Sequence, residues 1–169
     1  LFMIYREHSK AIEIILKYRE TPNCFEQAAK KFIAQHSEFE NTDIRSYWLW
    51  FIPKYFKPPV KVEMESWIAS YPIACWYRKI RDEKLGFVLE VGPIQNKEQR
   101  IKLMQVMEKS KILRVPQDAL SAGSRFTRVF SKYSEFEDWD SEELILEKME
   151  HLFFTEAKNA TKAVKEANE

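Results

Sequence analysis

The sequence predicts an α+β domain with a mostly antiparallel sheet, and three observations lead to this fold class. Apolar residues recur every three or four positions near both ends of the 169-residue chain, as they do along the buried side of a helix. The middle of the chain holds aromatic and aliphatic runs that lack this period and that stop at proline, glycine or charged turns. One amphipathic segment precedes the last of these runs. The expected order is two helices, three strands, a helix, a strand and a helix.

Residues 1–40 are expected to form a helical hairpin. Apolar side chains follow one stripe over residues 3–19, and Thr21-Pro22 separates this helix from the next, because proline fits the first turn of a helix. The second helix has a core-facing surface formed by Phe25, Ala28, Ala29, Phe32 and Ile33.

Residues 45–135 are expected to form the sheet and a helix that crosses it. We expect strands at residues 47–53, 71–80, 84–92 and 126–133. The charged link at 81–83 predicts a hairpin between the second and third strands. Both strands are apolar at nearly every position, so this hairpin should be covered on both faces. Residues 57–70 are a proline-started connection with a short strand or turn inside it.

Two capping boxes predict the remaining helices. Asn96 with Gln99 opens the crossing helix directly after the Gly92-Pro93 turn. Its inward stripe is Ile101, Met104 and Ile112, with Val106 or Met107 between them. Asp140 with Glu143 opens a long C-terminal helix over residues 140–169. Its apolar side thins to alanines after residue 154, so this end is expected to fray or to pack lightly.

Composition excludes several classes of protein. Only three glycines are present, so no glycine-rich nucleotide loop can be built. The two cysteines share no motif, nothing resembles a signal peptide, and no apolar run approaches the length of a membrane span. These features predict a cytoplasmic protein with reduced thiols and no membrane partner. The chain forms a single domain, and its first residue, Leu1 rather than Met, suggests a fragment of a longer chain.

Charge is segregated along the chain although the net charge is only +1. Residues 97–132 hold nine Lys/Arg against three Asp/Glu, and residues 134–150 hold eight acids against one lysine. A solvated basic face beside an acidic helix accounts for this pattern. A surface that binds phosphates is the alternative.

No residues in the chain predict a catalytic centre or a metal site. The three histidines, His8, His36 and His151, lie on different predicted helices without ligand spacing. A metal-dependent nuclease needs an acid and a Glu-x-Lys pair on adjacent strands. Glu90 ends a predicted strand, but Gly92 occupies the position where the lysine is needed. Glu90 is expected to pair with a cation instead, and Arg78 on the adjacent strand is the candidate.

Anion binding is the chemistry that the sequence supports best. The helix that begins at Asn96 offers backbone donors at its N-terminus, and the basic segment supplies cations nearby. The candidate anion-binding or nucleic-acid-binding residues are Lys54, Arg78, Asn96, Arg100, Arg125, Arg128 and Lys132. Aromatic side chains for base stacking cannot be told from core residues by sequence, and we assign Trp48, Trp50, Trp67 and Trp76 to the core.

Several fragments together resemble a known group of proteins. FIPK (51–54) ends an aromatic strand, LEVGP (89–93) ends another, and SRFTRVFSKY (124–133) precedes a helix start at Trp139-Asp140-Ser141. This order is similar to the C-terminal region of prokaryotic PD-(D/E)xK nuclease superfamily proteins, over residues 1–155.

The resemblance implies an accessory domain whose catalytic half is missing. In that superfamily the catalytic Asp and Glu-x-Lys precede this region, so any Mg²⁺ would belong to the parent nuclease and no cofactor is expected in this chain. The implied role is contact with DNA, or control of the chain's own nuclease domain, in antiviral defence. The alternative is a protein-interaction module that forms a homo-oligomer and does not contact nucleic acid.

Overall fold

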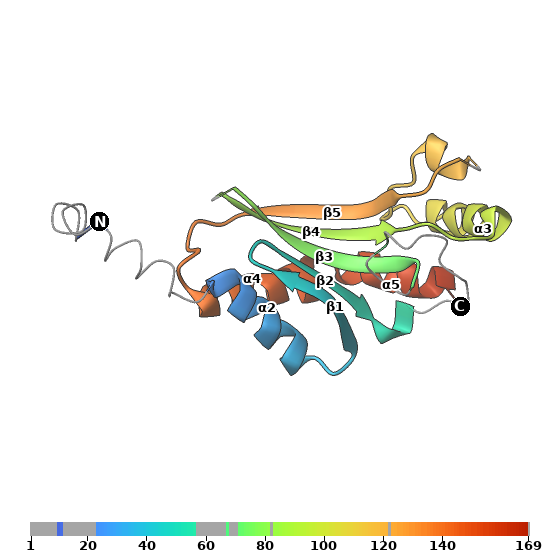
Figure 1. Ribbon diagram of the computed structural model, residues 1–169. Coiled ribbons are helices and arrows are strands. Elements are labelled where there is room, and N and C mark those ends of the chain that lie inside the picture. Colours follow the sequence, from blue (N-terminus) through green and yellow to red (C-terminus); the bar gives the residue numbers. More distant parts are fainter. Residues whose placement is uncertain are drawn as a thin grey trace.

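Five antiparallel strands form one sheet in the order β1-β2-β3-β4-β5, with helices packed against it (Figure 1). The computed structural model describes residues 10–11, 23–56, 67, 71–81, 83–121 and 123–168. Its strands are β1 (Phe39–Arg45), β2 (Trp48–Pro53), β3 (Ile73–Ile80), β4 (Lys84–Val91) and β5 (Thr127–Glu135). Its α-helices are α2 (Cys24–Gln35), α3 (Lys97–Glu108), α4 (Glu142–His151) and α5 (Lys158–Asn168). Short turns of helix are η1 (Lys54–Phe56), η2 (Gln117–Leu120) and η3 (Leu152–Glu156).

The predicted fold class is confirmed, and one strand was missed. β1 lies at an edge of the sheet, and its sequence FENTDIR is mostly polar. An edge strand needs few apolar residues, so its composition resembles a loop. Residues 3–19, the first half of the predicted hairpin, lie outside the described residues except for Lys10 and Ala11, which are helical. The connection at 57–70 also lies outside them, except for Trp67.

The core lies between the sheet and the layer formed by α2 and α4, which pack side by side. The predicted α2 stripe of Phe25, Ala28, Ala29 and Phe32 is buried. Phe32 contacts the rings of Phe51, Tyr77 and Phe153, which come from β2, β3 and η3. The Tyr77 hydroxyl also donates a hydrogen bond to the Met149 carbonyl on α4. These contacts join the two layers through one aromatic cluster.

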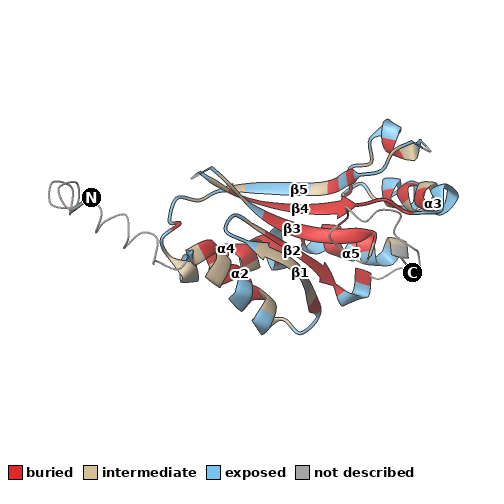
Figure 2. Cartoon of the chain, in the orientation of Figure 1, coloured by how far each residue is buried: buried red, intermediate tan, exposed pale blue. Residues whose placement is uncertain are grey.

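The β3–β4 hairpin is buried on both faces, as predicted, whereas β5 is mostly exposed (Figure 2). This contrast follows from position, because β5 is the other edge of the sheet. Its outer edge is partly paired, since the backbone N–H of Arg114 donates to the carbonyl of Val129 at 2.7 Å.

The C-terminal helix is interrupted. α4 continues into η3, a π-helical turn, where the N–H of Ala157 bonds to the carbonyl of Leu152, and α5 follows. The N-cap of α4 is Ser141, whose hydroxyl accepts from the N–H of Leu144, and not the expected Asp140. The expectation of a lightly packed end was wrong. Residues Ala157, Ala160, Ala163 and Val164 are buried, because α5 packs against α3.

The crossing helix α3 begins at the predicted cap, since the Asn96 side chain accepts from the N–H of Gln99. Its buried residues are Arg100, Met104 and Met107, and the expected inward residue Ile112 is half-exposed. Gly92 has a packing role. A Cβ at this position would lie 2.6 Å from the indole of Trp67, so the absence of a side chain lets that ring lie on the backbone.

Candidate functional site

The sheet face opposite the aromatic core carries tryptophans and arginines. Side chains alternate between faces along a strand, and the residues that share this second face include Trp50, Trp76, Arg78, Glu90 and Arg128. Trp50 stacks on Trp76 with ring centroids 5.7 Å apart, and Trp67 meets Trp50 edge-on at 5.3 Å. Of the four tryptophans assigned to the core, Trp67 and Trp76 are buried, and Trp48 and Trp50 are partly buried.

Glu90 is held by two partners on this face. The indole N–H of Trp76 donates to one carboxylate oxygen at 3.0 Å, and the Arg128 Nε lies 3.7 Å from the other. Burial raises the pKa of Glu90, and the bonds from Trp76 and Arg128 oppose that rise. The guanidinium of Arg128 also lies over the Trp76 ring, 5.2 Å from its centroid. The expected partner Arg78 was wrong, because Arg78 lies opposite Gly86, four residues before Glu90 on β4.

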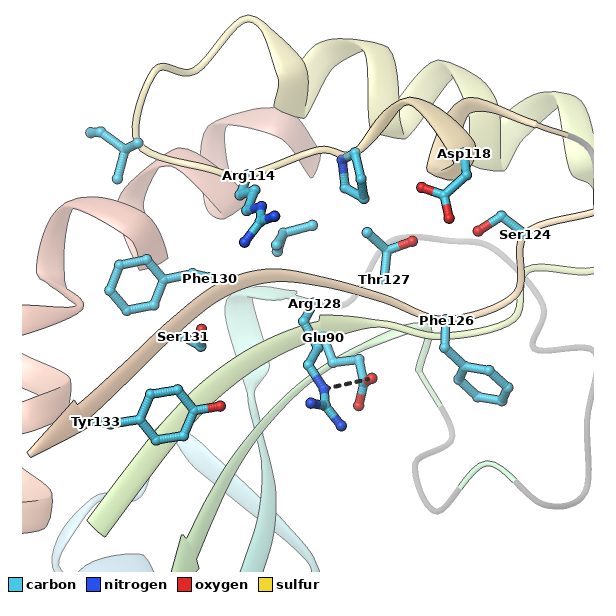
Figure 3. Close-up of a pocket in the computed structure, with 13 residues that line it drawn as sticks. Glu90, Arg114, Asp118, Ser124, Phe126, Thr127, Arg128, Phe130, Ser131 and Tyr133 are labelled. Carbon is cyan, nitrogen blue, oxygen red and sulfur yellow. Dashed lines mark ion pairs between the residues drawn. The ribbon is translucent and has the colours of Figure 1, made fainter. Parts of the chain in front are cut away.

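A hollow of about 740 Å³ lies beside β5, and we call it the β5 hollow (Figure 3). Its lining includes Ile112, Phe126 and Tyr133, which are 49%, 47% and 44% exposed. Arg114 and Arg128 also line it, and Figure 3 shows them on opposite sides of the β5 ribbon. The hollow therefore combines exposed apolar rings with two cations.

The lining also contains polar and acidic groups. Asp118 lies near Ser124 at one end of the β5 hollow, and Glu90 lies beside Arg128 (Figure 3). Glu90 and Arg128 form an ion pair, so Arg114 and Asp118 are the remaining charged side chains among the described lining residues.

An irregularity in β5 brings Arg128 and Tyr133 to the same face. Tyr133 follows Arg128 by five positions, with four residues between them, so a regular strand would point the two side chains in opposite directions. The register between β4 and β5 shifts between Leu89 and Glu90, which places Tyr133 opposite Gly86 and Arg128 opposite Glu90. The Tyr133 ring then lies over Gly86, where a Cβ would be 2.8 Å from two ring atoms.

The sequence-predicted site residues fall into separate groups. Arg128 and Arg78 lie on the second face and are exposed. Lys132 lies on the opposite face of β5, where its ammonium pairs with Glu156 at 2.9 Å. Lys54 follows β2, which two strands separate from β5, and donates to the Ser37 carbonyl.

The remaining predicted residues meet at the start of α3. Asn96 caps the helix, and Arg125 lies beside its first turn with Lys97 and Arg100. Arg100 is buried, with an exposed fraction of 3%, and its two terminal nitrogens bond to the Ala119 carbonyl and the Thr127 hydroxyl. It was expected on an accessible basic surface. In the structure it ties α3 to η2 and β5.

The sequence did not single out Arg114, Phe126 and Tyr133, which the structure places in the lining of the β5 hollow. Arg114 was counted only as part of the basic segment, and the two aromatics only as part of a strand. The alternation of FTRVFSKY gives no warning of the shifted register, so no signal in the sequence pairs Tyr133 with Arg128.

Nothing among the described residues forms a group of three or more His, Cys, Asp or Glu side chains able to hold a metal ion. Within the same residues, no helix has both the length and the apolar character that crossing a membrane requires. Comparison of the chain with protein-family models, curated proteins and solved structures gave no match. The nuclease resemblance therefore rests on the sequence fragments alone.

Proposed function

We propose that this chain is a non-catalytic accessory domain that contacts nucleic acid through the β5 hollow. The observation that supports this most is the gathering of Phe126, Tyr133, Arg114 and Arg128 around one open depression. Aromatic rings accept stacked bases of any sequence, and arginines beside them bind the phosphate backbone and the base planes.

Three of the apolar side chains that line the β5 hollow are unusually exposed and lie together. Eight large apolar side chains are half-exposed among the described residues, and three of them line the β5 hollow. Isolated exposed apolar residues are ordinary, but a cluster beside cations is typical of a binding surface. An open groove with flat rings suits a single strand or an unpaired end better than a rigid duplex.

The segment that supplies most of the hollow is basic, which favours a polyanion, although within the lining itself Arg114 and Arg128 are matched by Asp118 and Glu90. The first six residues of β5 and the loop that carries Arg114 both belong to the basic segment 97–132, which carries an excess of six positive charges. The acidic stretch that follows is partly neutralised by cations of the same chain, since the Lys84 ammonium pairs with the Glu135 carboxylate. The nuclease resemblance points to DNA as the ligand, and to a cytoplasmic role beside a nuclease domain in defence against foreign DNA.

The test is fluorescence anisotropy with single-stranded and double-stranded oligonucleotides over a range of salt concentrations. The wild type should prefer single strands, and log affinity should fall linearly with log salt. Phe126→Ala should weaken binding about 5- to 160-fold, because one stacked base contributes about 1–3 kcal/mol. Arg114→Ala should lower the salt slope by about 0.7 if it removes one phosphate contact with a single strand.

Two control variants match these changes. Phe154→Ala removes a comparably exposed ring on η3, and Lys30→Ala removes an exposed cation on α2. Both should bind oligonucleotides like the wild type. No binding by the wild type at low salt would refute the proposal. A stable dimer seen by light scattering, together with that result, would favour the protein-interaction alternative.

A further inference from the structure

Arg100 is a buried cation that no acidic side chain among the described residues pairs with. Its Nη1 donates to the Ala119 carbonyl and its Nη2 to the Thr127 hydroxyl, both at 2.7 Å, whereas its Nε has no hydrogen-bond partner. Burial lowers the pKa of Arg100, and no described carboxylate opposes that shift. Buried charges in proteins are normally paired, because an unpaired one is costly to remove from water. Within the part of the chain that the structure describes, this guanidinium therefore has no anion paired with it.

The surroundings of Arg100 add further positive potential. It lies in the first turn of the twelve-residue helix α3. The Asn96 side chain accepts from the N–H of Gln99, and the Asn96 carbonyl accepts from the N–H of Arg100. The N–H groups of the first turn lack acceptors within the helix, so those of Lys97 and Glu98 remain for another acceptor. The dipole of α3 also favours an anion at this end.

A cavity of about 140 Å³ lies at this point, between the start of α3 and the segment before β5. We call it the α3 cavity. Lys97, Arg100, Ser124 and Arg125 line it, and no Asp or Glu is among its described lining residues. Its volume is about one fifth of that of the β5 hollow, a size that suits one tetrahedral oxyanion better than a whole nucleotide.

We infer that the α3 cavity binds a single phosphate group. Arg100 supplies a buried charge, Lys97 an exposed one, Ser124 a hydroxyl, and the helix start its N–H donors. A terminal phosphate fits better than an internal phosphodiester, because it carries more negative charge and has only one covalent connection. Two sources share this chemistry, namely free inorganic phosphate and the phosphorylated end of a nucleic acid.

The second source rests on the proposed function. Ser124 lines both the α3 cavity and the β5 hollow, so the two spaces adjoin. A strand bound in the hollow could then place its terminal phosphate in the cavity. The first source does not depend on the hollow at all.

The first experiment follows thermal unfolding of the chain in sodium phosphate and in sodium chloride at equal ionic strength. Phosphate at about ten times its dissociation constant should raise the Tm by roughly 3–6 °C, with saturation. Exclusion of phosphate from the protein surface also raises the Tm, but it does so without saturation and equally in all variants.

Lys97→Glu is the informative variant, because Lys97 is exposed and an acid is well tolerated at a helix start. It should weaken phosphate binding at least tenfold. Lys102→Glu makes the same charge change at an exposed position of α3 outside the cavity lining, and should bind like the wild type. A phosphate effect that is unsaturable, or the same in both variants, would overturn the inference.

The second experiment compares oligonucleotides that carry a 5′ or 3′ phosphate with the same oligonucleotides that end in hydroxyls. Tighter binding of one phosphorylated end, lost in Lys97→Glu, identifies the nucleic-acid end as the source. Saturable inorganic phosphate with no end preference identifies free phosphate. Saturable phosphate without any oligonucleotide binding would refute the proposed function and leave the phosphate site standing.

Discussion

Gly92→Ala should destabilise the fold through one specific clash. The new Cβ would lie 2.6–2.7 Å from three atoms of the Trp67 indole, whereas ordinary contacts begin near 3.4 Å. The ring or the end of β4 must therefore move by about 0.8 Å. Gly92 does not adopt a positive φ, so alanine causes no backbone strain and the clash is the whole effect on the folded state.

The Trp67 ring cannot retreat freely. It contacts the rings of Trp50 and Phe126, and its indole N–H donates to the Tyr71 carbonyl at 2.6 Å. Overpacking of a buried site costs about 1–3 kcal/mol. Replacement of glycine by alanine also lowers the conformational entropy of the unfolded chain. This effect stabilises the folded state by about 0.4–1 kcal/mol. The clash should dominate, so we expect a net loss of about 0.5–2 kcal/mol in the free energy of unfolding.

Urea denaturation followed by circular dichroism measures this loss. Gly123→Ala is the matched control, because a Cβ there has no atom within 4 Å, and its stability should equal or slightly exceed that of the wild type. In a Trp67→Leu background the cost of Gly92→Ala should shrink, which a double-mutant cycle detects. Equal stability of Gly92→Ala and Gly123→Ala would show that the indole does not lie on Gly92.

Three further changes test other contacts by urea denaturation. Burial raises the pKa of Glu90, so the folded state binds the proton more tightly than the unfolded state does. The free energy of unfolding should therefore fall as the pH rises from the unfolded-state pKa of about 4.3 through the folded pKa. Over that pH window, Glu90→Gln should gain stability relative to the wild type. A pH-independent difference would contradict this. Gly86→Ala should cost less than about 1 kcal/mol, because the half-exposed Tyr133 ring can swing away, and a larger loss would show that the ring is fixed. Ser141→Ala should cost about 1 kcal/mol and Asp140→Ala much less, and the reverse order would restore the sequence-predicted cap.

The pattern of apolar residues in the sequence was sufficient to predict the helices and strands that are buried along one side or on both faces. The α2 stripe and the doubly buried β3–β4 hairpin were predicted correctly, because each has a regular apolar pattern. β1 was missed because an edge strand is stabilised by backbone pairing with β2 and not by apolar side chains. The break at η3 was missed because Phe153 and Phe154 continue the apolar pattern, so the π-helical turn leaves no mark in it.

The sequence does not predict the environment of each candidate site residue, because tertiary contacts determine it. Three basic residues of one segment have three environments: Arg100 is buried in contact with neutral oxygens, Arg128 holds the Glu90 carboxylate, and Lys132 pairs with Glu156 on the other face. A count of charges along the chain treats them alike. Distance in space, and not position in sequence, decides which of them has charge left for a ligand.

The shifted register of β5 also determines which side chains meet in the β5 hollow. With regular alternation from Arg128 onward, Tyr133 would lie on the core-facing side of the sheet, away from Arg128. The shift between Leu89 and Glu90 places Tyr133 and Arg128 together on that face. Register shifts of this kind are common at sheet edges and near functional sites, where they re-aim a side chain. The exposed ring and the cation are thus neighbours only because β5 is irregular, and a variant that restored regular pairing would separate them without removing either residue.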